Sequence, residues 1–227
     1  QKVLFVGKRN KDALLVSLLK APEINKVLVF TQMKHAANRV VEKLDAAGIR
    51  GTAIHGNKSQ AARTKALDGF KRGRFKVLVA TDVAARGLDV DDITHVINYD
   101  LPVEAETYVH RIGRTARAGA EGDAISFCCA EDRAYLREIE RLLGKPVPAE
   151  MEHAYHCDDA YRSKQAAPRN FGRGGGRGGG GRRPEGRSQG RRSNGGRSQG
   201  GRSQGGRSQG GSSQRDFARS RSRSGRR

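Results

Sequence analysis

Short apolar runs recur along the first 150 residues of the chain and alternate with segments of helical periodicity. Runs rich in Val, Leu, Ile and Ala predict strands at 27–30, 52–55, 76–80, 95–99 and 124–128. Segments of helical periodicity lie between and after these runs, at 34–47, at 60–72, from about 104 onward, and at 131–143. Nearly continuous apolar strands are typical of a parallel sheet that is covered on both faces. The alternation therefore predicts an α/β fold with helices on both faces of a parallel sheet and right-handed crossovers.

This pattern ends near Lys164. Residues 165–227 contain 17 Arg, no Lys, two acidic residues and 19 of the 30 Gly, and the pentapeptide Gly-Gly-Arg-Ser-Gln begins at Gly195, Gly200 and Gly205. A segment this polar cannot bury enough apolar surface to offset its chain entropy, so we expect it to be disordered. The sequence therefore predicts one folded domain and one tail.

The net charge is divided very unevenly between these two parts. The tail carries +15 of the formal +20, which leaves +5 for residues 1–164. Spaced arginines on a flexible backbone suit contacts to nucleic-acid phosphates that do not depend on sequence, and Arg planes also stack on unpaired bases. The alternative is a solubilising tail without a dedicated target.

Cysteine usage and hydropathy limit the cellular setting. Cys128, Cys129 and Cys157 form no paired motif, and the first two lie in an apolar run, so we expect reduced thiols and a cytoplasmic protein. The sequence shows no signal peptide and no apolar run of membrane-spanning length, so we expect no membrane partner. The chain begins at Gln1 without Met, and we expect it to be a segment of a longer protein.

The first candidate site follows the strand at 76–80. In an open α/β sheet, ligands bind at the carboxyl ends of the strands. There, Thr81 and Arg86 suit phosphate oxygens, and Asp82 or Asp89 suits ribose hydroxyls or the orientation of the arginine. The alternative is an ordinary strand-to-helix loop in which Thr81 or Asp82 caps a helix.

The second candidate site is a cluster of basic residues on the helix expected from about 104. Arg111 and Arg114 are three positions apart and should share one helix face, with His110 beside Arg114 and with Arg117 nearby. Guanidinium groups this close repel one another, and an anion between them relieves the repulsion. A phosphoryl-transfer site is such a place. The alternative is a solvated basic helix face.

Several segments in register resemble the C-terminal RecA-like lobe of DEAD-box ATP-dependent RNA helicases of superfamily 2. The matching strings are Val29-Phe30-Thr31-Gln32 (motif IV), Gln60-x-x-Arg63 (motif IVa), Ala80-Thr81-Asp82-x-x-Ala85-Arg86-Gly87-Leu88-Asp89 (motif V), Tyr99-Asp100-Leu101-Pro102, and His110-Arg111-Ile112-Gly113-Arg114-Thr115-x-Arg117 (motif VI). The string His55-Gly56-Asn57-Lys58-Ser59-Gln60 is most similar to the bacterial RhlE-type subgroup. The resemblance covers roughly residues 1–145.

Composition and charge predict a linker at 151–164 and an RNA-binding tail at 165–227. The resemblance implies a helicase C-terminal domain at 1–150. It also implies roles around ATP. Arg111 and Arg114 match arginine fingers that reach the γ-phosphate, Asp89 matches a carboxylate near the ribose, and His110 matches a residue that couples the nucleotide site to the other lobe.

The resemblance further implies that four positions lie at or beside the RNA sugar-phosphate backbone: Gly56, Arg63, Thr81 and Arg86. One departure from the family is visible, because Ala116 stands where glycine is usual. We expect a changed loop conformation there rather than lost function.

The parts that hold the nucleotide phosphates and Mg²⁺ in this family are absent from the sequence. It contains neither G-x-x-x-x-G-K-[ST] nor Asp-Glu-Ala-Asp, both of which belong to the N-terminal lobe. We therefore expect that lobe of the same protein to be a partner, to hold Mg²⁺, and to be required for ATP hydrolysis and local unwinding of RNA duplexes. The sequence names no other protein partner.

Two other functions fit parts of the sequence. The first is a superfamily 2 motor that acts on DNA, which would share the arginine-finger lobe. The second is a non-enzymatic RNA-binding or annealing protein that acts through its tail.

Overall fold

The computed structural model describes residues 1–90, 92–115 and 122–165. Its strands are β1 (Lys2–Phe5), β2 (Val27–Phe30), β3 (Gly51–Ile54), β4 (Val77–Ala80), β5 (His95–Asn98), β6 (Asp123–Cys128) and β7 (Ala149–Glu150). Its α-helices are α1 (Lys11–Leu19), α2 (Lys34–Ala46), α3 (Gln60–Lys71), α4 (Asp82–Ala85), α5 (Ala105–Ile112), α6 (Arg133–Leu143) and α7 (Asp158–Arg162). Two short 3₁₀ helices precede α1 and α6, at Lys8–Asn10 and Ala130–Asp132.

The seven strands form one sheet in the order β3-β4-β2-β5-β6-β1-β7. All strand pairs are parallel. Every residue of β2, β4 and β5 is buried, and β2 and β4 are unbroken apolar runs. The predicted α/β class and parallel sheet are therefore confirmed.

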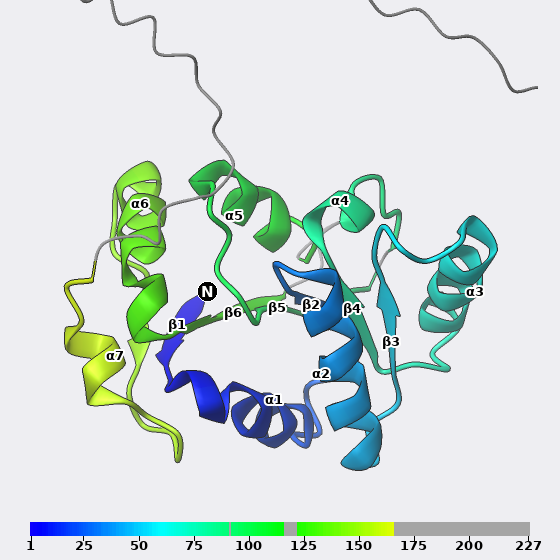
Figure 1. Cartoon of the computed structure of the whole chain (residues 1–227), viewed down its shortest axis with the longest axis horizontal. Coiled ribbons are helices and arrows are strands. Elements are labelled where there is room, and N and C mark those ends of the chain that lie inside the picture. Colours follow the sequence, from blue (N-terminus) through cyan, green and yellow to red (C-terminus); the bar gives the residue numbers. More distant parts are fainter. Residues whose placement is uncertain (91, 116–121, 166–227) are drawn as a thin grey trace, which may run out of the picture. The chain divides into compact units, whose positions relative to one another are not determined.

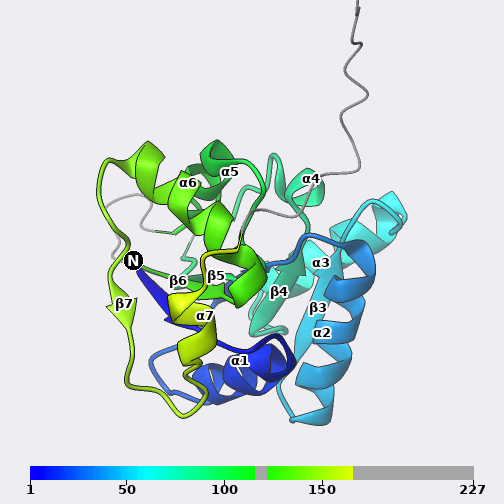
Figure 2. The same cartoon turned by 60° about the vertical axis from the view of Figure 1, so that its left-hand side comes forward.

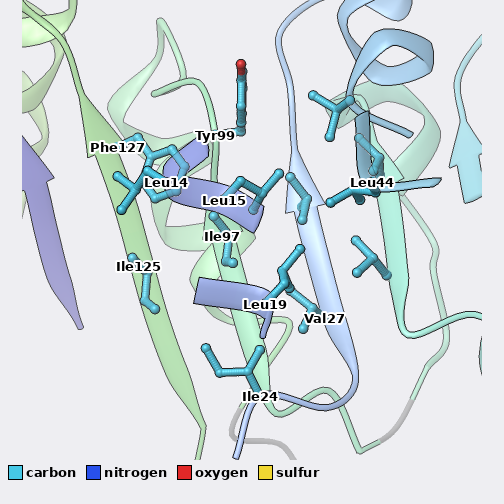
Figure 3. Close-up of a cluster of buried hydrophobic side chains, with 14 of the residues drawn as sticks. Leu14, Leu15, Leu19, Ile24, Val27, Leu44, Ile97, Tyr99, Ile125 and Phe127 are labelled. Carbon is cyan, nitrogen blue, oxygen red and sulfur yellow. The ribbon is translucent and has the colours of Figure 1, made fainter. Parts of the chain in front are cut away.

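Alternate residues of β1 to β6 enter different cores, because side chains along a strand point to opposite faces. Helices α1 and α2 cover one face, where Leu15, Leu19 and Leu44 pack against Val27 and Ile97 (Figures 1 and 3). The other face is covered by α3 and α4 over one part of the sheet and by α5 and α6 over another. The carboxyl ends of the neighbouring strands β4, β2 and β5 consequently lie side by side at one edge of the sheet.

The segment expected to be a linker, residues 151–164, contains α7. Ala160 of this helix is buried in the core formed with α6 and β1. Val6 forms an isolated bridge with His156, and Ser163 donates to the carbonyl of Ala130 at 3.0 Å. Figure 2 shows α7 close to β1. Residues 156–163 therefore contact the lobe.

Three cysteines occur as free thiols. Burial raises the pKa of Cys129 to about 11 and that of Cys128 to about 12. The prediction that these two thiols are buried and reduced is confirmed, and both stay protonated at neutral pH.

Candidate functional site

A hollow of about 340 Å³ opens beside the carboxyl ends of β2 and β4. Side chains of both basic and acidic character line it, including Asp82, Arg86, His110, Arg111 and Arg114. The structure thus brings together the two segments that the sequence singled out, although they are separated by about thirty positions along the chain. The strand order explains this, because α4 follows β4 and α5 follows β5, and both strands neighbour β2.

Arg111 is buried in this hollow with only 2 % of its surface exposed. Its Nε and one terminal nitrogen donate to the two carboxylate oxygens of Asp82 at 2.6 and 2.8 Å. The other terminal nitrogen donates to Asn98 Oδ1 at 3.1 Å and to the carbonyl of Asp100 at 2.7 Å, and the guanidinium lies 4.9 Å from the centre of the Phe30 ring. The alternative interpretation, a basic helix face exposed to solvent, is therefore excluded for Arg111. Its charge is neutralised by Asp82 within the lobe.

Arg114 does not share a helix with Arg111. Helix α5 ends at Ile112, and the backbone N–H of Arg114 donates to the carbonyl of Arg111 at 3.0 Å in the turn that follows. One guanidinium nitrogen donates to the carbonyl of Leu88 at 3.4 Å. The expectation of one shared helix face is thus wrong, because Gly113 ends the helix between the two arginines. Ala116 and Arg117 lie outside the described residues.

The segment after β4 begins a short helix, and one of its two carboxylates orients an arginine. Thr81 is the N-cap residue of α4, but its side chain makes no capping hydrogen bond. Asp82 does orient an arginine, but that residue is Arg111 and not Arg86, whose side chain is exposed. Gly87 has φ of +74°, in the left-handed region that favours glycine, and this turn ends the segment.

Asp89 lies at the far end of this loop with 87 % of its side chain exposed. Its nearest cation is Lys71, at 3.9 Å, and an exposed pair at this distance holds a carboxylate only weakly. His110 also has an exposed side chain, on the last turn of α5. Both side chains remain accessible to a ligand.

A second hollow, of about 160 Å³, lies on the other side of α4. Arg63 and Arg86 both line it, and Arg63 donates to the carbonyl of Ala84 at 3.5 Å. Gly56 follows the end of β3 and is exposed, with open space where a side chain would begin. Two of the four residues expected beside RNA thus face one hollow, and Arg86 lines this hollow as well as the first.

An ionic network that the sequence analysis missed lies beside the hollows. Lys11 is 4 % exposed and bonds Asp100 and Asp132, each at 3.1 Å. Burial alone would lower the pKa of Lys11, but the two carboxylates outweigh it and raise the pKa above its usual value. Asp100 also accepts from the backbone N–H of Gln32 at 3.1 Å. A charged residue at the start of a helix carries no local sign of this role, because its partners lie about 90 and 120 positions away.

Within 1–90, 92–115 and 122–165, no cluster of His, Cys, Asp or Glu side chains is arranged to hold a metal ion. In the same part of the chain, no helix combines the length and the apolar character needed to cross a membrane.

Comparison with known proteins places these features in a family. Residues 10–119 match the family described as helicase conserved C-terminal domain. The chain is 44 % identical over 150 residues to the ATP-dependent RNA helicase RhlB of Xanthomonas axonopodis pv. citri. The aligned residues make up 66 % of this chain and 26 % of that protein. The chain therefore spans about a quarter of the length of this relative.

Solved structures agree with the sequence match. The chain resembles the Escherichia coli DEAD-box protein SrmB bound to the regulator of ribonuclease activity A, with 39 % identity and a TM-score of 0.62 over 75 % of this chain and 97 % of that one. It also resembles Saccharomyces cerevisiae Dbp5 bound to RNA and ADP BeF3, with 32 % identity and a TM-score of 0.61 over 66 % of this chain and 40 % of that one. Because sequence, fold and strand-end motifs agree, this chain belongs to the DEAD-box RNA helicase family and contains the C-terminal RecA-like lobe of that family.

Proposed function

We propose that this lobe works in an ATP-dependent RNA helicase, where it closes over ATP–Mg²⁺ and RNA held jointly with an N-terminal RecA-like lobe. The observation that carries the proposal is the hollow where His110, Arg111, Arg114 and Asp82 meet at the strand ends. A relative with the same fold, Dbp5, has been solved with RNA and ADP BeF3, which supports the same two ligand classes for this chain.

In this proposal Arg114 donates to the transferring γ-phosphate. Arginine donors stabilise the charge that spreads over the phosphate oxygens in the transition state, and such a finger contributes about 10³- to 10⁵-fold to turnover. Arg111 was expected to do the same, but its donors toward Asp82, Asn98 and Asp100 are already engaged. We therefore assign phosphate contact to Arg114 and a supporting role to Arg111.

The remaining site residues divide between nucleotide and RNA. We propose that Asp89 accepts from the ribose hydroxyls and that His110 contacts the facing lobe, in keeping with the exposure of both side chains. Gly56, Arg63, Thr81 and Arg86 would contact the RNA sugar-phosphate backbone. Contacts to phosphate and sugar position the protein without reading sequence, so the lobe itself would not select an RNA target.

The N-terminal lobe would supply the phosphate-binding loop and the carboxylates that hold Mg²⁺, neither of which this sequence contains. Closure of the two lobes around RNA would then bring Arg114 to the phosphate. Local strand separation follows in this proposal from the shape that the closed lobes impose on the RNA backbone, and hydrolysis permits release.

The test compares ATP hydrolysis by residues 1–227 alone with hydrolysis by a protein in which the chain follows an N-terminal RecA-like lobe. We expect turnover only in the joined protein, with stimulation by RNA rather than DNA. Purified chain that hydrolyses ATP by itself would contradict the proposal, and stimulation by DNA alone would favour the DNA-directed motor. A third outcome would favour the non-enzymatic annealing protein that acts through its tail. In that case the joined protein would show no RNA-stimulated hydrolysis, and its Arg114→Ala variant would still anneal RNA.

A further inference from the structure

Two polar side chains lie inside the sheet next to the site and have no part in the proposed chemistry. Asn98 of β5 and Ser126 of β6 are both 0 % exposed and stand opposite each other in the register of the two strands. Their neighbours within these strands, including Val96, Ile97 and Phe127, are apolar and buried. Burying an amide and a hydroxyl costs free energy unless each is hydrogen-bonded, so their partners explain why a sheet carries them.

The partners form a continuous row of hydrogen bonds. Asn98 Nδ2 donates to Ser126 Oγ at 3.1 Å, and Asn98 Oδ1 accepts from Arg111 at 3.1 Å. The row therefore runs from Ser126 of β6 through Asn98 of β5 to Arg111.

The chemistry of Asn98 suits it to the middle of this row. A guanidinium is only a donor, so the oxygen of the amide must face Arg111 and its nitrogen must face Ser126. Asparagine supplies both an acceptor and a donor on a short side chain, whereas leucine supplies neither. Asn98 thereby holds one terminal nitrogen of the Arg111 guanidinium. Asp82 holds Nε and the other terminal nitrogen with two hydrogen bonds of 2.6 and 2.8 Å, so the plane of the guanidinium is fixed on both sides.

What Arg111 holds makes this orientation matter for the site. Asp82 is the first residue of α4, which has four residues and receives no side-chain cap from Thr81. The carbonyl of Arg111 accepts from the backbone of Arg114, in the turn that carries the arginine proposed to contact phosphate. Arg111 thus contacts the start of α4 through its guanidinium and the turn after α5 through its backbone carbonyl.

We propose that Asn98 and Ser126 are positioning residues that lock Arg111, and through it hold Asp82 and the Arg114 turn in the geometry needed for hydrolysis. The effect on turnover rests on the proposed function, whereas the locking of Arg111 does not. Misplacement of a reacting group by about 1 Å can lower a rate by roughly 10²-fold, so a device of this kind is needed around a short helix.

The first arm of the test uses residues 1–227 alone. The Nε–H proton of Arg111, assigned through its loss in Arg111→Lys, should exchange slowly with solvent in NMR spectra because it is buried and bonded to Asp82. We expect exchange to become about tenfold faster or more in Asn98→Leu and in the milder Ser126→Ala, as local opening becomes easier. Ile97→Val is the matched control, since it removes one methyl group from the next residue of β5 on the opposite face and should leave this proton unchanged.

The second arm uses the same variants in the protein with both lobes. Asn98→Leu should lower kcat by about tenfold with little change in KM for ATP, as expected for an interaction that matters in the transition state. In an Asp82→Asn background the loss caused by Asn98→Leu should largely disappear, because both changes act through Arg111. A residue that only stabilised the fold would lower activity equally in both backgrounds.

The two arms distinguish the two ideas. Unchanged Arg111 exchange in folded Asn98→Leu and Ser126→Ala would overturn the locking role, as would a kcat loss of equal size with and without Asp82→Asn. If the joined protein lacked RNA-stimulated hydrolysis, the proposed function would fail, and the NMR arm would still decide whether Asn98 and Ser126 lock Arg111.

Discussion

Arg111 and Arg114 are three positions apart and have different surroundings, which determine what each can do. The guanidinium of Arg111 is held by Asp82, Asn98 and the backbone of Asp100 inside the lobe. Arg114 stands beyond the end of α5, on the wall of the hollow. Arg111 therefore maintains the structure of the site, whereas Arg114 is proposed to act on the ligand.

Removing Arg111 should destabilise the lobe far more than removing an exposed arginine from the same hollow. Arg111→Ala leaves the carboxylate of Asp82 and the amide of Asn98 without a partner, and breaking a buried ion pair costs about 3–5 kcal/mol. Because Asp82 is one-third exposed, we expect about 3 kcal/mol, at the lower end of this range. The control is Arg86→Ala, which should change the free energy of unfolding by only about 0.5 kcal/mol. Urea denaturation of residues 1–227 measures both, and equal losses would contradict the buried role of Arg111.

Sequence reasoning found most residues of the site but not what Arg111 does. Thr81, Asp82 and His110 stood out because polar groups follow apolar runs at places where ligands bind in α/β folds. The pairing of Arg111 depends on Asp82, which lies 29 positions away, and on Asn98, which reads as the polar end of a strand. Spacing along a helix could not reveal either contact, and it also placed Arg114 on a helix that ends before it.

Among the secondary-structure elements, the central strands were predicted to within one or two residues. Strand β2 was predicted without error at 27–30 because four apolar residues stand between polar neighbours, and α2 and α3 were predicted from their periodicity and the glycines near their ends. Strand β7 was missed because two residues carry no periodicity. Helix α7 was missed for a similar reason, since five residues, three of them charged, look like a linker until Ala160 is seen in the core.

Helix α3 depends on its N-cap for part of its stability. Ser59 Oγ accepts from the backbone N–H of Ala62 at 3.3 Å, and this satisfies one of the donors that a helix start leaves open. Ser59→Ala should destabilise the lobe by about 1 kcal/mol, whereas Ser59→Asp should preserve the cap. Chemical denaturation of both variants checks this prediction, and an equal loss in the two would mean that the cap contributes little.

The same helix carries Arg63, so the cap variants also report on the RNA side of the site. If Arg63 contacts the RNA backbone, fraying of the first turn of α3 should weaken RNA binding in Ser59→Ala and spare it in Ser59→Asn, which keeps a capping side chain without adding a charge that repels phosphate. Loss of binding in both variants would instead point to a direct role of the Ser59 hydroxyl.

At the scale of the whole molecule, burial of histidines links the stability of the lobe to pH. Burial lowers the pKa of His55, His95 and His153, and neighbouring lysines lower that of His55 further. Each folded histidine therefore binds fewer protons than the unfolded chain at pH values just below the unfolded pKa of about 6.5. This contribution to stability is complete above about pH 6.5 and is lost as the pH falls toward the folded pKa.

We accordingly expect the lobe to be less stable at pH 5.5 than at pH 7.5. His55→Gln should reduce the difference, because His55 is 3 % exposed and its ring is bonded to Asn38 at 3.0 Å. The control is His35→Gln, whose side chain is exposed and which should leave the difference as it was. Melting temperatures across this pH range measure the effect, and a lobe that became more stable on acidification would contradict it.

The charge of the molecule is concentrated outside the part of the chain that the structure describes. Residues 166–227 carry 17 Arg against two acidic residues, a net charge of +15. The lobe has its own cations at the candidate RNA surface, Arg63 and Arg86, but it is only mildly basic. We therefore expect two RNA-binding regions of different character. Binding by the lobe should be coupled to ATP, and the affinity of the tail should depend mainly on salt concentration.

Deleting residues 166–227 should weaken RNA binding and flatten its dependence on salt. The cut keeps Gln165, whose carbonyl accepts from Arg137 at 2.7 Å, so the described contacts of the lobe remain. Binding to single strands releases counterions, and the log–log salt slope grows by about 0.7 for each phosphate neutralised. If roughly five tail arginines engage at once, the slope should fall by about three to four units in the truncated protein.

A tail with every Arg changed to Lys separates charge from stacking. It should keep the slope but bind unpaired bases less tightly, because lysine lacks the planar group that stacks. Salt titrations of RNA affinity on the three proteins decide the matter, and equal slopes with and without the tail would identify it as a solubilising extension.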